Sequence, residues 1–446
     1  MLPENWDSLT PEERMEARLA GWMSTEDKEF ATEEAARVYE ERARRLRDVI
    51  RLKKPDRVPI ILLSGNVAAD HAGVTYGDLF YDYEKAVNAV IKFHQDFPLD
   101  FQAVTNFMPG PVYDRLDYKL YKWPGGNMAD DVTFQAVEGE YMKADEYDAL
   151  IADPEGFLMR TYTPRIMGAL QGLQFLPSFI NTSEMPFVPF MLAPYLAPPV
   201  AEAFNALLEA AQEAGKWFGA LGQIGAVAQG QMGLPGLIGG FAKAPFDFIG
   251  DTLRGTRGIM LDMYRQPDKL LEACERLVPI AVNMAVSNAN ASGNPMSFIV
   301  MHKGADGFMS NADFAKFYWP TLKAVMYGMM EQGVVPFCFV EGGYNQRLDI
   351  IAASDLPAGR TAWLFDKTDM NAVKDKFGDW ACFGGNVPAS LYKAGTPQQM
   401  KDYVKDLIDR VAGDGGYFLS PGAVLDDVET ANLEAYFEAG LAYGKY

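Results

Sequence analysis

Short apolar runs that end in polar residues recur along the chain, with helical stretches between them. The first is VPIILLSGN at residues 58–66, an unbroken apolar stretch that ends in glycine and asparagine. Four more form a cluster in the second half: FIVMHKGAD (298–306), VVPFCFVEGG (334–343), TAWLFDKTD (361–369) and WACFGGNVP (380–388). Continuous apolar runs of this length predict strands of a parallel sheet, which is buried on both faces.

The segments between these runs have helical character. Residues 311–333 carry apolar residues at helical spacing, and Thr396-Pro397 predicts the start of a helix over 397–412. A further apolar run, GYFLSPGAVL, follows at 416–425. The repeated order of strand, polar turn and helix predicts a parallel α/β fold. In a (β/α)8 barrel the polar strand ends meet at one mouth and form the active site.

The N-terminal region and two irregular segments complete the predicted organisation. Residues 1–50 read as helix, with a capping box at Thr10-Pro11-x-Glu13. We expect an N-terminal helical extension over 1–50, packed on the barrel or on another subunit, and a barrel over 51–446. Residues 107–165 and 175–245 are rich in proline, glycine, aromatic residues and methionine, and they predict loop insertions over the C-terminal mouth.

One stretch within the second insertion carries no charge. It covers residues 217–242, which are 26 residues with eight glycines, one proline and three glutamines. That composition is poor for a membrane-spanning helix. We expect the end of a helix followed by a buried, glycine-rich active-site loop; a membrane-skimming or partner-docking segment is the alternative.

Composition narrows the class of protein. The formal net charge is −20, from 60 acidic and 40 basic residues, so the surface repels nucleic-acid and anionic lipid phosphates. Three cysteines in 446 residues do not make a disulfide framework and suit a reducing compartment. The polar N-terminus has no secretory apolar segment. These features predict a cytoplasmic enzyme.

Two strand ends carry the strongest candidate chemistry. His302 ends one apolar run and Glu341 ends the next. His302 suits a general acid toward a leaving phenolate or alkoxide, and with Glu341 it suits a divalent metal ligand pair. A third ligand would come from Asp306, Asp366 or Cys382. The bland alternatives are a histidine that orders its loop, a salt bridge from Glu341 to Arg347, and a buried Cys382.

Other polar residues near strand ends are secondary candidates. Asp366 is a further catalytic candidate beside Asp306, and Asp369 suits a helix cap. Candidate substrate contacts are His71, Asn106, Tyr344, Arg347 and Asn386. Arg254 and Arg257 suit either an anionic substrate or ion pairs on a helix face.

Several motifs resemble the uroporphyrinogen decarboxylase superfamily over roughly residues 45–440. They are PFDFIGDTLRGTRGIMLDMYRQPDKLLEA, HKGADGFMS, EGGYNQRL, GGNVPASLYKAGTPQQMKDYVKDLID and GYFLSPGAV. The resemblance implies a (β/α)8 barrel, which agrees with the alternation described above, and a homodimer as the usual assembly.

The resemblance implies one of two chemistries. Decarboxylases of the superfamily bind a polycarboxylate through an arginine-rich motif after the first strand. Here that position reads SGNVAADHAG (64–73), without arginine, so porphyrinogen decarboxylation fits poorly. The other branch transfers methyl groups to or from a corrinoid carried by a partner protein. Its thiol-methylating members bind zinc through His-x-Cys and a later cysteine, and here these positions read Phe339-Val340-Glu341 and Ala423.

The oxygen- and nitrogen-bearing mouth therefore favours an O-demethylase. We expect methyl transfer from a methoxylated, possibly aromatic, donor to a corrinoid protein, with zinc as a second cofactor to consider. A cofactor-independent lyase acting on a smaller carboxylated substrate is the alternative, and a non-catalytic ligand-binding or corrinoid-handling barrel is another.

Overall fold

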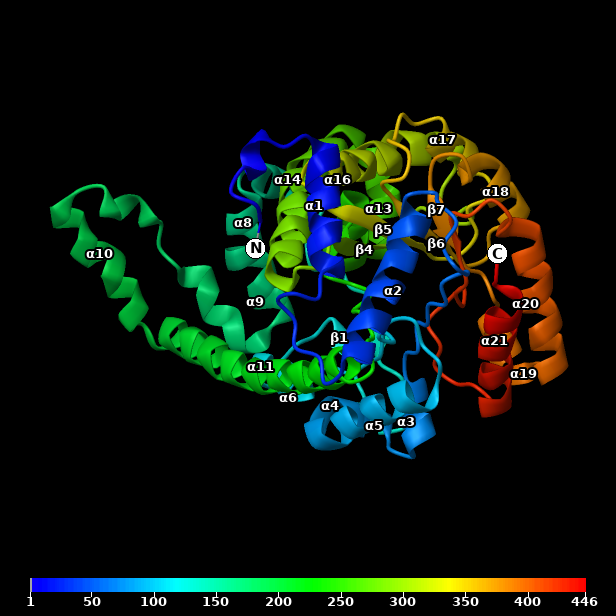
Figure 1. Cartoon of the computed structure of the whole chain (residues 1–446). Coiled ribbons are helices and arrows are strands. Elements are labelled where there is room, and N and C mark those ends of the chain that lie inside the picture. Colours follow the sequence, from blue (N-terminus) through cyan, green and yellow to red (C-terminus); the bar gives the residue numbers. More distant parts are fainter. Residues whose placement is uncertain (1) are drawn as a thin grey trace.

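Six parallel strands in the second half of the chain form the centre of the molecule (Figure 1). The computed structural model describes residues 2–446. The strands pair in chain order, β3 to β8. Their bounds are Gly240–Lys243 (β3), Met296–Met301 (β4), Val335–Val340 (β5), Ala362–Phe365 (β6), Cys382–Gly384 (β7) and Tyr417–Phe418 (β8). The predicted runs at 298–306, 334–343, 361–369 and 380–388 are thus confirmed as strands with polar ends.

Two extended segments continue this sheet into a ring. Segment 58–65 bonds to the β8 region, where Ile61 N donates to Leu419 O at 2.8 Å, and to the next segment, where Val104 N donates to Leu62 O at 3.2 Å. Segment 101–106 reaches the approach to β3 through Gln102 N and Pro235 O, at 2.9 Å. The predicted barrel architecture is confirmed, with eight segments around one core.

Helices surround the ring and follow the strands. In the first half they are α1 (Pro11–Met23), α2 (Glu33–Ile50), α3 (Val67–Ala72), α4 (Tyr76–Tyr81), α5 (Tyr83–Asp96), α6 (Gly110–Leu116), α7 (Tyr147–Ala152), α8 (Pro154–Phe157), α9 (Thr163–Ile166), α10 (Val188–Leu192) and α11 (Pro198–Gly230). In the second half they are α12 (Pro245–Asp247), α13 (Gly255–Arg265), α14 (Pro267–Ser292), α15 (Asn311–Asp313), α16 (Trp319–Glu331), α17 (Leu348–Ala352), α18 (Met370–Phe377), α19 (Ala389–Ala394), α20 (Pro397–Val411) and α21 (Thr430–Tyr443).

Shorter elements connect these helices. The 3₁₀-helical turns are η1 (Trp6–Ser8), η3 (Gly168–Phe175), η4 (Phe179–Thr182), η5 (Met185–Phe187) and η6 (Ala193–Leu196). The π-helical turns are η2 (Leu158–Tyr162), η7 (Phe248–Leu253) and η8 (Phe314–Tyr318). A two-stranded antiparallel ribbon, β1 (Tyr121–Lys122) with β2 (Gln135–Ala136), lies in the first insertion.

The N-terminal helices close the end of the barrel opposite the mouth. Leu19 and Trp22 of α1 and Leu46 and Val49 of α2 belong to one apolar cluster with inward-facing strand residues such as Phe337. Thr10 forms the predicted capping box with Glu13 at the start of α1. Of the two expected arrangements, packing on the barrel or on another subunit, the structure shows the extension packed on the barrel.

The uncharged stretch at 217–242 is arranged differently from the prediction. It is helical to Gly230, and its remaining glycines lead into the first residue of β3. Gly236 O accepts a hydrogen bond from Asn294 Nδ2, just before β4 begins. The glycine-rich loop thus lies at the N-terminal ends of the strands, away from the mouth, because it enters a strand instead of leaving one.

An arm projects from the body of the molecule ahead of α11 (Figure 1). We define the arm as residues 176–197, which contain η4, η5, α10 and η6. Among residues 2–446, no single helix is long and apolar enough to span a bilayer; the bent pair Met185–Leu196 and Pro198–Gly230 meets that test by length and composition.

Candidate active site

The register of the sheet brings His302 and Glu341 together. Met301 and Val340 are paired as the last residues of β4 and β5, so the next residue of each strand lies at the same level of the mouth. His302 Nε2 lies 3.4 Å from Glu341 Oε2. Both side chains are partly exposed, so the pair faces the opening of the barrel.

Asp251 fixes the other side of the imidazole. It lies on η7, which follows β3, and its Oδ2 is 2.6 Å from His302 Nδ1. Lys243 Nζ is 2.9 Å from the same oxygen, and Lys303 Nζ is 3.0 Å from Asp251 Oδ1. Residues of two neighbouring barrel strands, β3 and β4, therefore converge on one carboxylate, and His302 is oriented with Nε2 toward Glu341.

These contacts set the protonation of the pair. Burial alone would lower the pKa of His302, but the hydrogen bond and charge of Asp251 raise the pKa above its ordinary value. Burial opposes ionisation of Asp251, yet its hydrogen bond to His302 and the charge of Lys243 bring its pKa well below the ordinary range. The cluster favours an imidazolium held by a permanent carboxylate.

A second carboxylate supports the loop that carries His302. Asp247 is fully buried, and its Oδ2 accepts hydrogen bonds from His302 N at 3.0 Å and from Tyr318 Oη at 2.6 Å. Its Oδ1 accepts from Lys303 N at 2.9 Å. Burial and the charge of Asp251 raise the pKa of Asp247. Asp247 thus pins the backbone of the residue that follows β4.

Glu341 lies in an environment that favours its neutral form. Burial raises the pKa of its carboxyl, although the nearby His302 acts in the opposite direction. Asp366, which follows β6 at the same level, accepts a hydrogen bond from Gly342 N at 3.0 Å, and burial raises its pKa as well. Glu341 Oε2 lies 3.4 Å from His302 Nε2, so the two groups are placed to exchange a proton.

Three residues predicted as site residues near these strand ends form hydrogen bonds with neighbouring loop residues. Arg347 is completely buried and donates to the backbone oxygens of Gly304, Ala305 and Met309. Tyr344 is buried and donates to Met301 O at 3.2 Å. Asp306 accepts from Gln346 N at 3.2 Å. In this structure the polar atoms of Arg347 and Tyr344 hold the loop after β4.

The remaining predicted substrate contacts are spread around the barrel. His71 packs between α3 and α5, with Nε2 2.7 Å from Asp96 Oδ2 and its ring against Phe93, so it is not brought to the His302–Glu341 pair. Asn106 Nδ2 donates to Asn66 Oδ1 at 3.0 Å, at the end of the second barrel segment. Asn386 Nδ2 donates to the backbone oxygens of Asp366 and Thr368, which makes it a support of the loop after β6.

The predicted third metal ligand does not join the pair. Cys382 is the first residue of β7 and is fully buried in the apolar cluster that contacts α2, at the opposite end of the barrel from His302. Within residues 2–446, no three His, Cys, Asp or Glu side chains are grouped to hold a metal ion. Asp251 is already committed to two lysines, so the donor set here does not fit a zinc site with three protein ligands.

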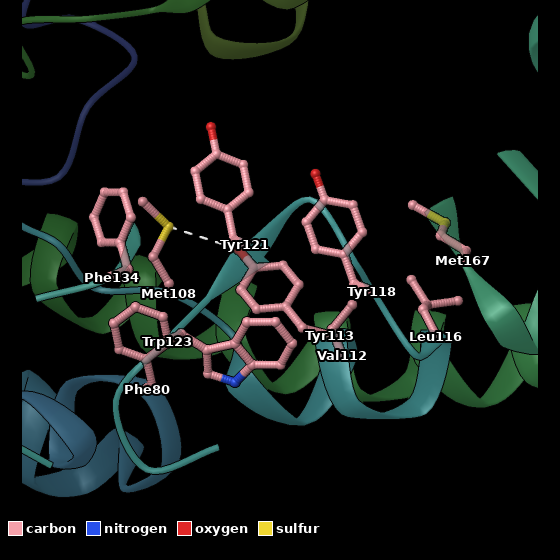
Figure 2. A pocket seen from close by; sticks show the side chains of 10 residues that line it. All are labelled: Phe80, Met108, Val112, Tyr113, Leu116, Tyr118, Tyr121, Trp123, Phe134 and Met167. Carbon is pink, nitrogen blue, oxygen red and sulfur yellow. Dashed lines mark hydrogen bonds between the residues drawn. The ribbon is translucent and has the colours of Figure 1, made fainter. Parts of the chain in front are cut away.

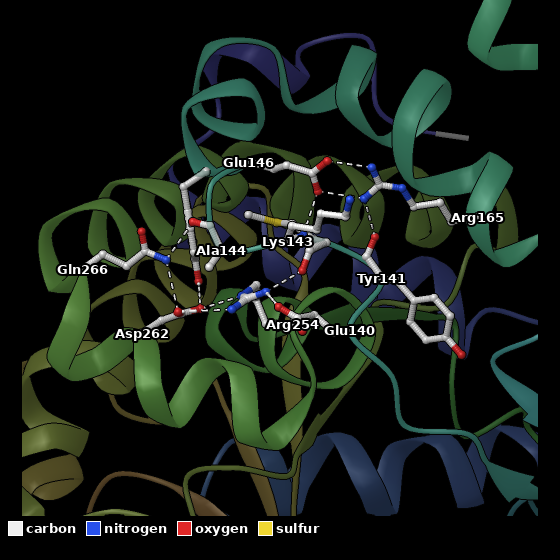
Figure 3. Close-up of polar contacts among 11 residues, drawn as sticks. Glu140, Tyr141, Lys143, Ala144, Glu146, Arg165, Arg254, Asp262 and Gln266 are labelled. Carbon is white, nitrogen blue, oxygen red and sulfur yellow. Dashed lines mark hydrogen bonds and ion pairs between the residues drawn. The ribbon is translucent and has the colours of Figure 1, made fainter.

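Arg254 clamps the first insertion onto the barrel (Figure 3). It is buried, and its Nε donates to Asp262 Oδ2 at 2.6 Å while Nη1 bonds to Glu140 and to Met142 O. Of the two alternatives left open by the sequence, Arg254 therefore follows the ion-pair one. The neighbouring Arg257 is exposed.

Sequence reasoning missed Asp247 and Asp251 as site residues. Both lie in the segment PFDFIGD, directly after the strand GFAK, and they are spaced four residues apart. The sequence does offer a signal for these two residues, because they follow a strand that ends at Lys243. That strand was not recognised, since the uncharged run before it does not resemble the start of a strand.

Comparisons with known proteins agree with this geometry. Residues 189–443 match the family model described as uroporphyrinogen decarboxylase (URO-D). A solved structure described as a methyltransferase from Methanosarcina mazei is similar over 91% of this chain and 98% of its own, with a TM-score of 0.56 and 14% sequence identity, which shows a shared fold. No curated protein sequence gives a significant match. Because the family model covers more than half of a chain whose barrel carries its polar cluster at the strand ends, the chain belongs to the uroporphyrinogen decarboxylase family.

Proposed function

We propose that the chain is a methyltransferase that moves a methyl group from a methoxylated donor to a corrinoid carried by a partner protein. One observation carries the proposal: His302, held by Asp251, points its second nitrogen into the barrel mouth beside Glu341. An ether needs a proton on its oxygen before the methyl group can leave, and this cluster supplies a positioned acid. The likeness to a protein described as a methyltransferase supports the same direction.

The proposed reaction needs one proton and one nucleophile. His302 Nε2–H donates to the ether oxygen as the carbon–oxygen bond breaks, and the donor leaves as an alcohol or phenol. The reduced corrinoid, when docked at the mouth, supplies the nucleophile that accepts the methyl group. Asp251 stabilises the charged imidazole before transfer, and Glu341 returns a proton to Nε2 afterwards.

The two lysines keep Asp251 from competing for that proton. Lys243 and Lys303 contact both oxygens of the Asp251 carboxylate, which therefore stays ionised throughout the cycle. Lys303 is also fixed by Thr256 Oγ1 at 3.0 Å. The arrangement gives the acid a fixed orientation, because the only mobile proton lies between His302 and Glu341.

The test combines the purified chain, a reduced corrinoid protein and a panel of methoxylated donors. Methyl transfer is followed by the absorbance of the corrinoid and by the demethylated product. We expect His302→Gln to lower the rate by roughly 10²- to 10⁴-fold. His71→Gln is the matched control, since that histidine packs between α3 and α5. The proposal is overturned if no donor is demethylated, or if the chain alone releases carbon dioxide from a carboxylated substrate, which would establish the lyase alternative.

A further inference from the structure

We propose that the first insertion forms a binding site for a neutral aromatic ring, and that this ring belongs to the methyl donor. The assignment of the ring to the donor rests on the proposed function, whereas ring binding does not. The observation is an aromatic cavity of about 410 Å³ lined mainly by residues of the first insertion (Figure 2). This volume lies within the range of small-molecule sites.

The lining is apolar and rich in aromatic rings. It consists of Phe80, Met108, Val112, Tyr113, Leu116, Tyr118, Tyr121, Trp123, Phe134 and Met167. No charged side chain is among these residues. A flat aromatic ring gains dispersion and edge-to-face contacts in such a lining, whereas a carboxylate would lose its hydration without gaining a cation.

The rings are held in fixed relative positions. Tyr113 and Trp123 meet edge to face at 5.3 Å between centroids, and Tyr121 and Phe134 meet in the same way at 5.9 Å. Trp123 Nε1 donates to Tyr81 Oη at 2.9 Å. Tyr118 and Tyr121 stack at 6.1 Å, and Figure 2 shows their hydroxyls pointing away from Trp123. A preformed cavity binds a rigid ring with little loss of side-chain entropy.

The cavity is anchored beside the acid cluster. Glu138 accepts a hydrogen bond from Thr256 N, and Met142 N donates to Leu253 O at 2.8 Å, so the insertion is attached at the end of η7, the turn that carries Asp251. Burial is the main cause that raises the pKa of Tyr121, and the charge of nearby Asp251 raises it further. These contacts join the insertion that lines the cavity to the turn that carries Asp251, and the assignment of the ring to the donor requires its methoxy substituent to reach His302.

Calorimetric titration of the full chain tests the site without a corrinoid. The probe is 1,2-dimethoxybenzene, compared with 4-methoxybenzoate and methanol. We expect the neutral ring to bind most tightly and Tyr121→Ala or Phe134→Ala to weaken it at least about tenfold. Both residues are partly exposed, so folding is checked by circular dichroism. Tyr264→Ala removes an exposed ring of α13 outside the cavity and should leave Kd unchanged.

The possible failures are distinguishable. Equal binding by wild type and both variants, or tighter binding of 4-methoxybenzoate, overturns the aromatic site and leaves the methyl transfer standing if other donors react. Ring binding that depends on Tyr121 and Phe134, with no transfer to any corrinoid, supports the site and overturns the proposed methyl transfer alone.

Discussion

The geometry of a single imidazole depends on residues from two barrel strands and the turn that follows the first of them. Lys243 ends β3, Asp251 follows on η7, and Lys303 follows β4. Their charges meet at the Asp251 carboxylate, and this carboxylate in turn bonds to His302 Nδ1. Asp251 is therefore a positioning residue, which acts on the reaction only through His302.

Replacing Asp251 should shift the titration of His302. In Asp251→Asn the opposite charge is lost while the shape is kept, so we expect the pKa of His302 to fall toward or below its ordinary value. The measurement is NMR titration of the histidine ring protons, with His302→Gln assigning the signal. The ring of His71 packs against Phe93, so its signals should be the same in Asp251→Asn as in the wild type. An unaltered His302 titration would show that Asp251 does not control its protonation.

The raised pKa of His302 also gives a direction for the pH dependence of folding stability. A histidine whose folded pKa is raised contributes stability at low pH, and the contribution is lost as pH rises through the folded pKa. The imidazole is 38% exposed, so solvent screening keeps the contribution small. Under the proposed mechanism the consequence for activity is larger than the one for stability, because methyl transfer requires the protonated ring.

Sequence reasoning located part of this site for a clear reason. His302 and Glu341 each end an apolar run, and parallel strands align such ends at one mouth. Arg347 gave the same signal, yet it is buried and satisfies backbone oxygens. A one-dimensional pattern marks polarity at a strand end, but whether the side chain turns into the mouth or back into the loop depends on the loop conformation.

At the scale of elements, most strands were predictable, whereas β3 and the insertions were not. β4, β5 and β6 are runs of four to six residues that are buried almost throughout, a signal that needs no long-range information. The first insertion instead depends on contacts such as those of Arg254 with Asp262 and with Glu140. The contact with Glu140 joins residues more than a hundred positions apart.

Arg254 should be the most sensitive single position of that clamp. Arg254→Met leaves Asp262 buried without its counter-charge, so we expect about 3–5 kcal/mol lost from the free energy of unfolding. The urea midpoint measures this loss. Arg257→Met, which removes an exposed arginine three residues later, should change the midpoint little. If the two variants behaved alike, the clamp would not contribute to stability.

The cap of α20 offers a milder prediction. Thr396 Oγ1 accepts from Gln399 N at 3.3 Å, and Gln399 Oε1 accepts from Thr396 N at 2.9 Å. Thr396→Ala removes one half of this box and should destabilise the chain by about 1 kcal/mol. The Tm measures it, with Ser390→Ala as control, an exposed hydroxyl within α19. An unchanged Tm would mean that packing of α20 on α21 alone holds the helix start.

At the scale of the whole molecule, ring closure joins distant parts of the chain. Segment 58–65 lies between the β8 region and segment 101–106, so the first and last barrel segments are neighbours. The apolar run at 58–66 predicted a strand, but its partners were not readable, because pairing across 350 residues leaves no local pattern. The position of the arm was unreadable for the same reason.

The net charge of −20 makes a prediction that separates two causes of ligand selectivity. The aromatic cavity should prefer a neutral ring over 4-methoxybenzoate both because its lining has no cation and because the whole acidic surface repels an anion. Salt screens the second cause, with a Debye length that falls from roughly 30 Å at 0.01 M to about 8 Å at 0.15 M. It leaves desolvation inside the cavity largely unchanged. Titration of both ligands at these two salt concentrations should therefore narrow the ratio of their Kd values without abolishing it. Complete loss of selectivity at 0.15 M would assign the preference to the surface field alone, and the cavity would then have no part in excluding anions.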